Sequence, residues 1–415
     1  MRWLLRTVVL LAALCLPSPA SALCRMSSCA PDARQPSGAV YRICMPEPGC
    51  ENGDLVLWAH GYVDVTRPIE IPEDQMGRPG GPTLPQVFNA LGFAFATTSY
   101  RQNGLVVKEG IEDLRELVEI FRATHGSPER IYLLGGSLGG AITALSMERL
   151  PEIYDGGLAA CGPIGDFRKQ FSYIADFRVV FDYFFPGLIP GTPGNVPPEV
   201  MQNWGSVYVP RIKEALRAQP RARKQLLRVT HAPSALFDSS TEEATALEVL
   251  YFSVFGATDA IARLGGSPFD NRFRFYRGSD NDIDLNLKVK RFGADVAALN
   301  ELEANYQTSG GLARPLVTLH TTGDPVVPYW HERLYSFKAW FNGSAGLHSN
   351  VPSYRYGHCE FGPADVILSF ALLVLKVRGQ ELLGVDELIR DPMAREEFLE
   401  RARAMDVLPS ASDLP

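Results

Sequence analysis

The chain has 415 residues, of which 46% are hydrophobic and 21% charged, and its formal net charge is −7. This length fits one large domain with an insertion, or two domains, and the composition is that of an ordinary globular protein. The acidic balance argues against nucleic acid or an anionic membrane as the main partner, because both require a basic surface.

The first 22 residues have the pattern of a signal peptide. Arg2 and Arg6 flank the start of the apolar run Val8–Leu16, and residues 20–22 supply the small side chains of a cleavage site. This run is too short to cross a bilayer, and we expect no transmembrane segment elsewhere. The sequence therefore predicts an exported protein, secreted or periplasmic, with 38 basic and 47 acidic residues after cleavage.

Six cysteines remain after the predicted leader, and an even number in an exported chain predicts disulfides. Six cysteines allow fifteen pairings. Short spacings favour the two local pairs Cys24–Cys29 and Cys44–Cys50, which would leave Cys161 with Cys359. None of the spacings is typical of zinc ligands, so we expect no structural metal.

Short apolar runs alternate with helical patterns in the first third of the chain. Residues 23–37 look irregular. The alternation of buried runs and amphipathic helices predicts a mostly parallel sheet with helices on both faces, as in α/β proteins. The expected strands are Leu55–Ala59, Phe93–Ser99, Arg130–Leu134 and Gly157–Cys161, and the expected helices lie around residues 111–125 and 140–150.

This alternation stops near Gly162 and resumes at about residue 313. Long helical stretches, Val200–Leu227 and Phe292–Tyr306 among them, lie between these points and are interrupted by segments rich in proline and glycine. We therefore expect one α/β core, residues 23–161 and 313–415, with a helical lid or cap inserted at 162–312. The second half of the core is expected to contain strands at 315–321 and 352–356 and helices at 329–341 and 364–378.

The motif Gly-Gly-Ser-Leu-Gly at residues 135–139 lies between an expected strand and an expected helix. A serine in this position must occupy a tight turn, with glycines two residues before and after it to avoid steric clashes. Such a turn holds the hydroxyl at the carboxyl edge of the sheet. Ser137 is therefore the predicted nucleophile, and a glycine-rich connection without chemistry is the alternative.

A serine nucleophile needs a base, and the base needs an orienting carboxylate. Asp324 follows the strand at 315–321, and His358 follows the strand at 352–356, in the chain order serine, acid, histidine. His331 competes as the base, but no strand precedes it directly. His320 lies inside a strand and is interpreted as a hydrogen-bonded core histidine. We expect Asp324 and His358 to complete a catalytic triad.

Acyl transfer also requires donors for the oxyanion of the intermediate. The backbone N–H of Leu138 is one expected donor, since this residue follows the nucleophile. The segment His60-Gly61-Tyr62 follows the first long strand, and the N–H of Tyr62 is the second expected donor. His60 is expected to support this loop and not to act as the base.

These motifs together resemble the α/β-hydrolase superfamily, with the match covering about 38–161 and 313–410. The resemblance implies a secreted serine esterase or lipase with an α/β-hydrolase fold and a large lid. The pair His358-Cys359 is also similar to the tannase and feruloyl-esterase group, in which a disulfide ties the cysteine after the histidine to one just before the serine. Here Gly136 precedes Ser137, so that pattern is broken.

Cys161 ends the strand after the nucleophile helix and is expected at the same edge of the sheet as Ser137. We therefore expect a Cys161–Cys359 disulfide that holds the His358 loop near the nucleophile, with two separate thiols as the alternative.

The predicted activity is the hydrolysis of carboxylic esters of small or polymeric substrates, without a cofactor. An exported serine peptidase or aminopeptidase with the same triad is a second interpretation, and an inactive binding protein on this fold is a third. The acidic run Asp280–Asp284 has Leu285 and Arg291 where a calcium loop needs glycine and glutamate, so no calcium site is expected. The aromatic residues at 171–185 are interpreted mainly as the core of the lid. The sequence does not determine the oligomeric state.

Overall fold

The computed structural model describes residues 24, 29–77, 80–235, 238–379, 393, 396 and 400. The predicted signal peptide at 1–22 lies outside the described residues, as does most of the chain beyond 379.

Eight strands form one sheet in the order β1-β2-β4-β3-β5-β6-β7-β8. The pairs β1–β2 and β2–β4 are antiparallel, and all other neighbours are parallel. The mostly parallel sheet, with this strand order and a serine turn after β5, is an α/β-hydrolase fold, so the expected fold class is confirmed. The strands are Ala33–Arg34 (β1), Val40–Cys44 (β2), Leu55–Ala59 (β3), Ala94–Thr98 (β4), Ile131–Gly136 (β5), Gly156–Ala160 (β6), Leu316–Gly323 (β7) and His348–Tyr356 (β8).

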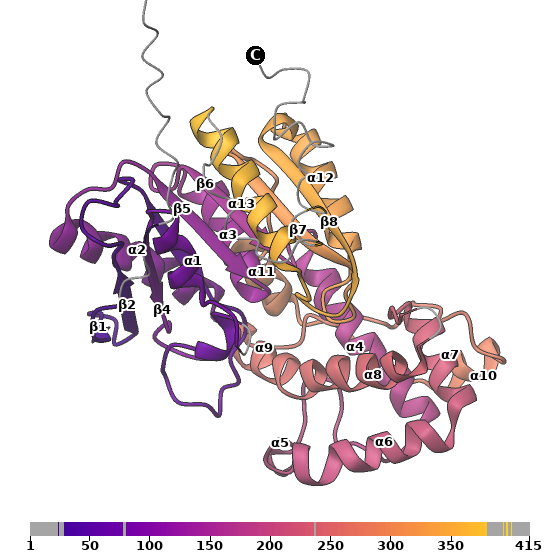
Figure 1. Ribbon diagram of the computed structural model, residues 1–415. Coiled ribbons are helices and arrows are strands. Elements are labelled where there is room, and N and C mark those ends of the chain that lie inside the picture. Colours follow the sequence, from indigo (N-terminus) through magenta and orange to yellow (C-terminus); the bar gives the residue numbers. More distant parts are fainter. Residues whose placement is uncertain are drawn as a thin grey trace, which may run out of the picture.

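Helices cover both faces of this sheet (Figure 1). Leu114, Leu117 and Leu145, from two of the helices, share one apolar cluster with Leu55 and Leu57 of β3. Phe88, Phe370 and Leu373, from the helices of the opposite face, share a second cluster with Val56 and Val317. The central strands are therefore apolar on both sides, as expected for a parallel sheet. The covering helices are α1 (Leu84–Ala90), α2 (Val107–His125), α3 (Leu138–Arg149), α12 (Trp330–Phe341) and α13 (Pro363–Arg378); η1 (Glu73–Gln75) and η3 (Ala345–Leu347) are short 3-10 turns.

The chain between β6 and β7 forms a group of helices next to the carboxyl edge of the sheet (Figure 1). We call α4 to α11 the inserted helices. Phe177, Phe181 and Phe185 of this segment are buried and belong to the same apolar cluster as Leu57 of β3. The inserted helices are α4 (Phe167–Phe184), α5 (Pro198–Gln202), the π-helical turn η2 (Trp204–Tyr208), α6 (Val209–Ala218), α7 (Pro220–Thr230), α8 (Ser239–Val254), α9 (Gly256–Leu264), α10 (Asp282–Lys288) and α11 (Val296–Asn305).

The expectation of one long helical stretch over Val200–Leu227 is wrong in detail. The structure divides it into α5, η2, α6 and α7, and both α6 and α7 have a proline in their first turn. Proline lacks a backbone N–H and is tolerated at the start of a helix but not in its interior. Pro210 and Pro220 therefore begin new helices.

The sequence also missed elements at the amino-terminal end of the core. β1 lies in the segment that was expected to be irregular, and β2 and α1 were not predicted. The predicted local disulfides Cys24–Cys29 and Cys44–Cys50 are wrong: the structure pairs Cys24 with Cys50 and Cys29 with Cys44. The reason is that β2 holds Cys44 beside the incoming chain, and spacing alone does not reveal such pairing.

Among the described residues, one helical stretch, Ser239–Leu264, is long and apolar enough to cross a membrane by length and composition. Half of its most apolar window is buried inside the protein. Core helices of other proteins pass the same test, so this stretch is only weak evidence for a membrane span. It is the one described stretch that departs from the expectation of no transmembrane segment after the leader.

Candidate active site

Ser137 occupies a sharp turn between β5 and α3, with φ 56° and ψ −120°. A non-glycine residue with this backbone is held there by its surroundings. A Cβ atom on Gly135 would clash with the carbonyl of Gly139, and one on Gly139 would clash with the carbonyl of Ala59. The two glycines of the motif therefore allow β3, β5 and α3 to meet closely enough to present Ser137.

Of the three residues expected to form a triad, His358 lies within hydrogen-bond distance of both Ser137 and Asp324. His358 Nε2 is 2.8 Å from Ser137 Oγ, and His358 Nδ1 is 2.8 Å from Asp324 Oδ2. Asp324 is completely buried, and the His358 side chain is 16% exposed. The imidazole thus bridges a hydroxyl at the sheet edge and a carboxylate in the interior.

The Asp324 carboxylate is held in its charged form by its partners. Its Oδ1 accepts hydrogen bonds from the backbone N–H groups of Val326 and Val327, each at 2.9 Å. Burial by itself would raise the pKa of Asp324, but the charges and hydrogen bonds of His358 and His320 lower it to about 2. Asp324 is therefore ionised at neutral pH and can accept a hydrogen bond from the Nδ1–H group of His358.

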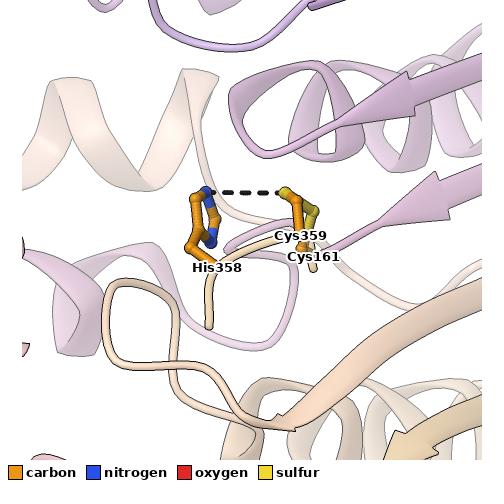
Figure 2. Close-up of side chains that lie close together, drawn as sticks. All are labelled: Cys161, His358 and Cys359. Carbon is orange, nitrogen blue, oxygen red and sulfur yellow. Dashed lines mark hydrogen bonds between the residues drawn. A yellow bond between two sulfur atoms is a disulfide. The ribbon is translucent and has the colours of Figure 1, made fainter. Parts of the chain in front are cut away.

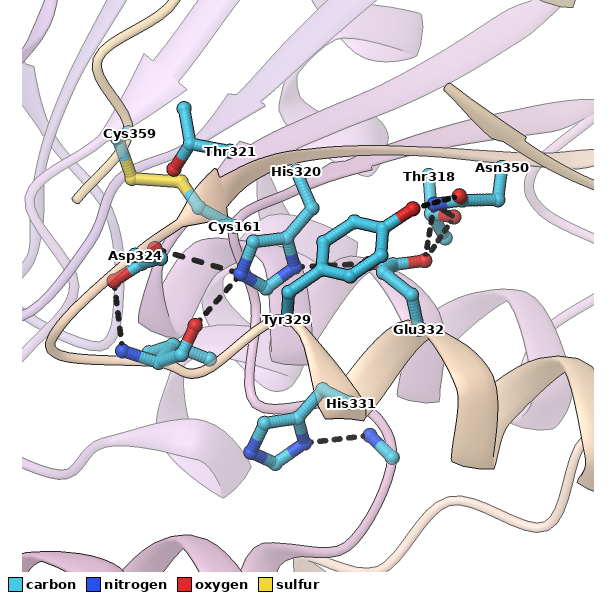
Figure 3. Close-up of polar contacts among 12 residues, drawn as sticks. Cys161, Thr318, His320, Thr321, Asp324, Tyr329, His331, Glu332, Asn350 and Cys359 are labelled. Atoms are coloured by element: carbon cyan, nitrogen blue, oxygen red, sulfur yellow. Dashed lines mark hydrogen bonds and ion pairs between the residues drawn. A yellow bond between two sulfur atoms is a disulfide. The ribbon is translucent and has the colours of Figure 1, made fainter. Parts of the chain in front are cut away.

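A second histidine, His320, is buried behind this carboxylate (Figure 3). His320 Nε2 is 2.8 Å from the carbonyl of Val327 and 3.4 Å from Asp324 Oδ2, and its Nδ1 is 3.0 Å from Glu332 Oε1. Both ring nitrogens thus face acceptors only, so both must donate, and the ring must carry two protons. Burial opposes this charge, but Asp324 and Glu332 raise the pKa of His320 to about 10.

Glu332, which balances the His320 charge, is itself hydrogen-bonded. Its Oε2 accepts from Thr318 Oγ1 at 2.5 Å and from Asn350 Nδ2 at 2.7 Å. The expectation that His320 is a hydrogen-bonded core histidine is confirmed, but the sequence analysis missed Glu332. A glutamate in an amphipathic helix looks like a surface residue, and nothing in its spacing shows that it faces inward.

The loop after β8 that carries His358 is joined to the ends of β6 and β7. Thr321 Oγ1 donates to the carbonyl of Gly357 at 2.6 Å, and a disulfide joins Cys161 to Cys359. His358 Nε2 is also 3.6 Å from Cys359 Sγ (Figure 2). These contacts tether the loop that presents His358 on both sides of the imidazole.

The candidate ligand atoms of Cys161, His358 and Cys359 lie within 4.8 Å of one another, close enough to share a metal ion. Both sulfur atoms belong to the disulfide, and a metal binds the free thiolate. The group is thus unsuited to a metal. In the acidic run, Asp280 pairs with Arg221 and Arg228, so this carboxylate is engaged with side chains of the protein.

The other histidines considered from the sequence lie in different environments. His331 is buried in α12, where Nδ1 accepts from the N–H of Gly165 at 2.9 Å and Nε2 faces Gln170 Oε1 at 2.9 Å. Burial lowers the pKa of His331 well below its usual value, so this ring is neutral. His60 is buried and stacks on Tyr100, and burial lowers its pKa to about 4.

The loop expected to supply an oxyanion donor packs against the nucleophile. A Cβ on Gly61 would come within 3.2 Å of Ser137 Cβ. Gln75 braces this loop, since its Oε1 accepts from the N–H of Gly61 at 2.7 Å and its Nε2 donates to the carbonyl of Tyr62 at 3.2 Å. The sequence analysis missed Gln75, which is 14 residues from Gly61. Within the described part of the chain, the N–H groups of Tyr62 and Leu138 have no acceptor.

A cavity of about 90 Å³ opens beside Ser137, between the core and the inserted helices. Its wall is apolar, and the few polar groups include Gln170, whose amide is already bonded to Val326 and His331. No charged side chain belongs to the wall as described. The lining residues are Tyr62, Leu105, Ser137, Leu138, Pro163, Phe167, Gln170, Phe171, Ile174, Phe252, Gly256, Ala257, Ala260, Val326 and Val327.

Neither a protein-family model nor a curated protein matches the chain. Among solved structures, acylaminoacyl peptidase from Pyrococcus horikoshii is similar at 11% identity and a TM-score of 0.45, over 88% of this chain and 44% of that one. Feruloyl esterase B from Aspergillus oryzae is similar at 14% identity and a TM-score of 0.43, over 84% of this chain and 79% of that one. The chain thus spans less than half of the length of the peptidase.

The His320–Glu332 pair generates a stability prediction. His320 has a folded pKa of about 10 against an ordinary value of 6.5, so its stabilisation is complete below pH 6.5 and is lost as pH rises through 10. We expect Glu332→Gln to lower the free energy of unfolding at pH 6.5 by about 3 to 5 kcal/mol, because it removes one of the two carboxylates that balance the buried charge of His320. The loss should shrink towards pH 10, as measured by urea denaturation.

Glu303→Gln is the matched control, because Glu303 is exposed on α11. It should change the free energy of unfolding by less than about 0.5 kcal/mol at every pH. A Glu332→Gln loss that stays constant or grows between pH 6.5 and 10 would contradict a doubly protonated His320.

Proposed function

We propose that the protein is an exported serine hydrolase that cleaves carboxylic esters with Ser137, His358 and Asp324. The observation that carries this proposal is the chain of two 2.8 Å hydrogen bonds from Ser137 Oγ through His358 to Asp324. Its location at the end of an apolar cavity supports the same conclusion. The three disulfides fit an oxidising compartment outside the cytosol.

In this mechanism Ser137 Oγ attacks the ester carbonyl while His358 Nε2 takes the hydroxyl proton. Asp324 keeps Nδ1 protonated and balances the positive imidazole that forms. The backbone N–H groups of Leu138 and Tyr62 stabilise the oxyanion. His358 then gives its proton to the departing alcohol, and water, activated by the same imidazole, releases the acid from Ser137.

The inserted helices would act as a lid that also supports the triad. In α4, Tyr173 Oη donates to the carbonyl of Pro325 at 2.7 Å, and Gln170 Nε2 donates to that of Val326 at 2.8 Å. These contacts hold the loop that follows Asp324. The same helix lines the cavity with Phe167 and Phe171. The lid and the acid loop are therefore expected to behave as one unit.

The cavity is suited to the acyl part of the substrate. It is lined by Ser137, which keeps the acyl group after the first step, and by Leu138, an expected oxyanion donor. An apolar wall gains free energy by removing hydrocarbon from water, about 0.8 kcal/mol per buried methylene. We therefore infer an ester with an apolar acyl group of several carbons.

An exported serine peptidase with the same triad is the second candidate function. It would require a group that recognises a peptide amine or carboxylate, and the cavity wall contains no charged side chain. An inactive binding protein is the third. Against it stands the complete hydrogen-bonded chain from Ser137 to Asp324, which has no purpose in a binding protein.

A labelling experiment tests the nucleophile. A fluorophosphonate should form an adduct with Ser137, which mass spectrometry can locate. The Ser137→Ala variant should form no adduct, and its kcat for p-nitrophenyl butyrate should fall by about four to six orders of magnitude. Ser146→Ala, a buried serine of α3, is the control and should keep the activity. If the wild-type protein forms no adduct, the proposal that it is a serine hydrolase is wrong. If it hydrolyses peptide anilides but not esters, the peptidase function is favoured.

Filling the cavity tests the acyl site. Ala257 lines the cavity wall. The larger side chain of Ala257→Leu should exclude about two methylenes of the acyl chain from the cavity, so kcat/KM for p-nitrophenyl hexanoate should fall by about tenfold. The acetate ester should be hydrolysed as before. Ala218→Leu, at an exposed position of α6, should affect neither ester. Equal losses on acetate and hexanoate would place the acyl group elsewhere.

The Cys161–Cys359 disulfide should position the base. The Cys161→Ser/Cys359→Ser variant should lose about 10- to 100-fold in kcat, because a displacement of about 1 Å in a catalytic group has this effect. Cys29→Ser/Cys44→Ser is the matched control, since this bond lies away from the triad; it should lower stability by about 2 to 5 kcal/mol with kcat unchanged. Equal kcat values for the two variants would show that the bond only stabilises the fold.

A further inference from the structure

Residues 60–62, which we call the oxyanion loop, combine a close contact with a flexible backbone. A Cβ atom on Gly61 would come within 3.2 Å of both Ser137 Cβ and the carbonyl of Gly136. Glycine allows this approach, but it also leaves the backbone free to take up many conformations. The peptide that joins Gly61 to Tyr62 carries one of the expected oxyanion donors, the N–H of Tyr62. Its orientation must therefore be fixed by contacts from other parts of the chain.

The backbone groups on either side of this peptide are hydrogen-bonded. The Gln75 side chain takes two of them, because Oε1 accepts from the N–H of Gly61 at 2.7 Å and Nε2 donates to the carbonyl of Tyr62 at 3.2 Å. The carbonyl of Gly61 lies 2.7 Å from His60 Nδ1, and a carbonyl can only accept, so the ring donates this bond. Of the four backbone groups of Gly61 and Tyr62, the N–H of Tyr62 alone has no partner among the described residues.

These contacts determine the direction of the free N–H. The carbonyl of Gly61 and the N–H of Tyr62 belong to one planar trans peptide, so they point in opposite directions. Because His60 holds the carbonyl, the N–H points away from His60. Rotation of this peptide would disturb the peptides before and after it, and Gln75 is bonded to both. One side chain thus opposes the rotation that Gly61 would otherwise permit.

The segment that carries Gln75 is anchored to the core independently of the oxyanion loop. Gln75 is the last residue of η1, and the next residue, Met76, is buried in the same apolar cluster as Phe88 of α1. Gly77 then forms an isolated β-bridge with Thr83, the N-cap residue of α1. The position of Gln75 is therefore set by the packing of α1, and its amide can hold the loop in place.

We propose that Gln75 is a positioning residue for the oxyanion hole, because it holds the peptides on both sides of the Gly61–Tyr62 bond and so keeps the N–H of Tyr62 in the orientation that the reaction needs. This proposal rests on the proposed esterase function. Gln75 does not belong to the cavity wall as described, so it acts through the donor. Its loss should weaken the transition state more than the binding of the ester.

The Gln75→Met variant tests this role, since methionine has a similar length but no amide. We expect kcat and kcat/KM for p-nitrophenyl butyrate to fall together by about 10- to 100-fold with KM nearly unchanged, because a misplaced donor affects only the transition state. A trifluoromethyl ketone, which forms a tetrahedral oxyanion with Ser137, should lose affinity by the same factor. A loss of stability alone would not change these two measurements in parallel.

Gln86→Met is the matched control. Gln86 Oε1 accepts from the N–H of Thr83 at 2.8 Å, so this side chain stabilises the same segment through its other end. The control should lower stability and leave kcat unchanged. A Gln75→Met variant with the kcat of the wild type, or equal losses of kcat in the two variants, would overturn the proposal.

A second variant, Gln75→Glu, separates the two contacts of this side chain. Its carboxylate can still accept from the N–H of Gly61, but it can donate to the carbonyl of Tyr62 only when it is protonated. Its kcat relative to the wild type should therefore rise as the pH is lowered from about 8 to about 5. A ratio that stays constant over this range would contradict the proposal. Failure of the esterase function is distinguishable, since the wild type would then not hydrolyse p-nitrophenyl butyrate at any pH.

Discussion

The buried charge of Asp324 is the constraint on which the site depends. A carboxylate in the interior must be fully hydrogen-bonded and balanced by charge, or it takes up a proton. Two backbone N–H groups occupy one oxygen, and His358 and the more distant His320 face the other. The charge of His320 is in turn balanced by Glu332. Asp324, His320 and Glu332 thus form a row of alternating charges in the interior behind His358.

The inserted helices also contact the loops that carry Asp324 and His358. The loop after Asp324 is held by α4 through Tyr173 and Gln170, and the strand end before His358 is held by α8 through Thr245. The same two helices line the cavity with Phe171 and Phe252. Movement of these helices would therefore change both the shape of the cavity and the geometry of the loops that carry Asp324 and His358.

The fold was largely predictable because its buried strands are short apolar runs separated by amphipathic helices. Errors occurred where local signals were weak. β2 (Val40–Cys44) contains an arginine, and α1 has seven residues, too few for a clear helical period. The long expected helix at 200–227 failed because Pro210 and Pro220 start new helices. The disulfides of Cys24 and Cys29 were mispaired because spacing along the chain does not report which strand lies beside which.

The sequence by itself determined the chemistry that is available: a serine between two glycines after a strand, then an aspartate and a histidine, each after a later strand. These signals are local, since a turn and a strand end are properties of a few neighbouring residues. Tertiary structure alone decided the environment of these groups. Gln75 and Glu332 come from segments without any motif, and they reach the site only because the segments that carry them pack against one sheet edge.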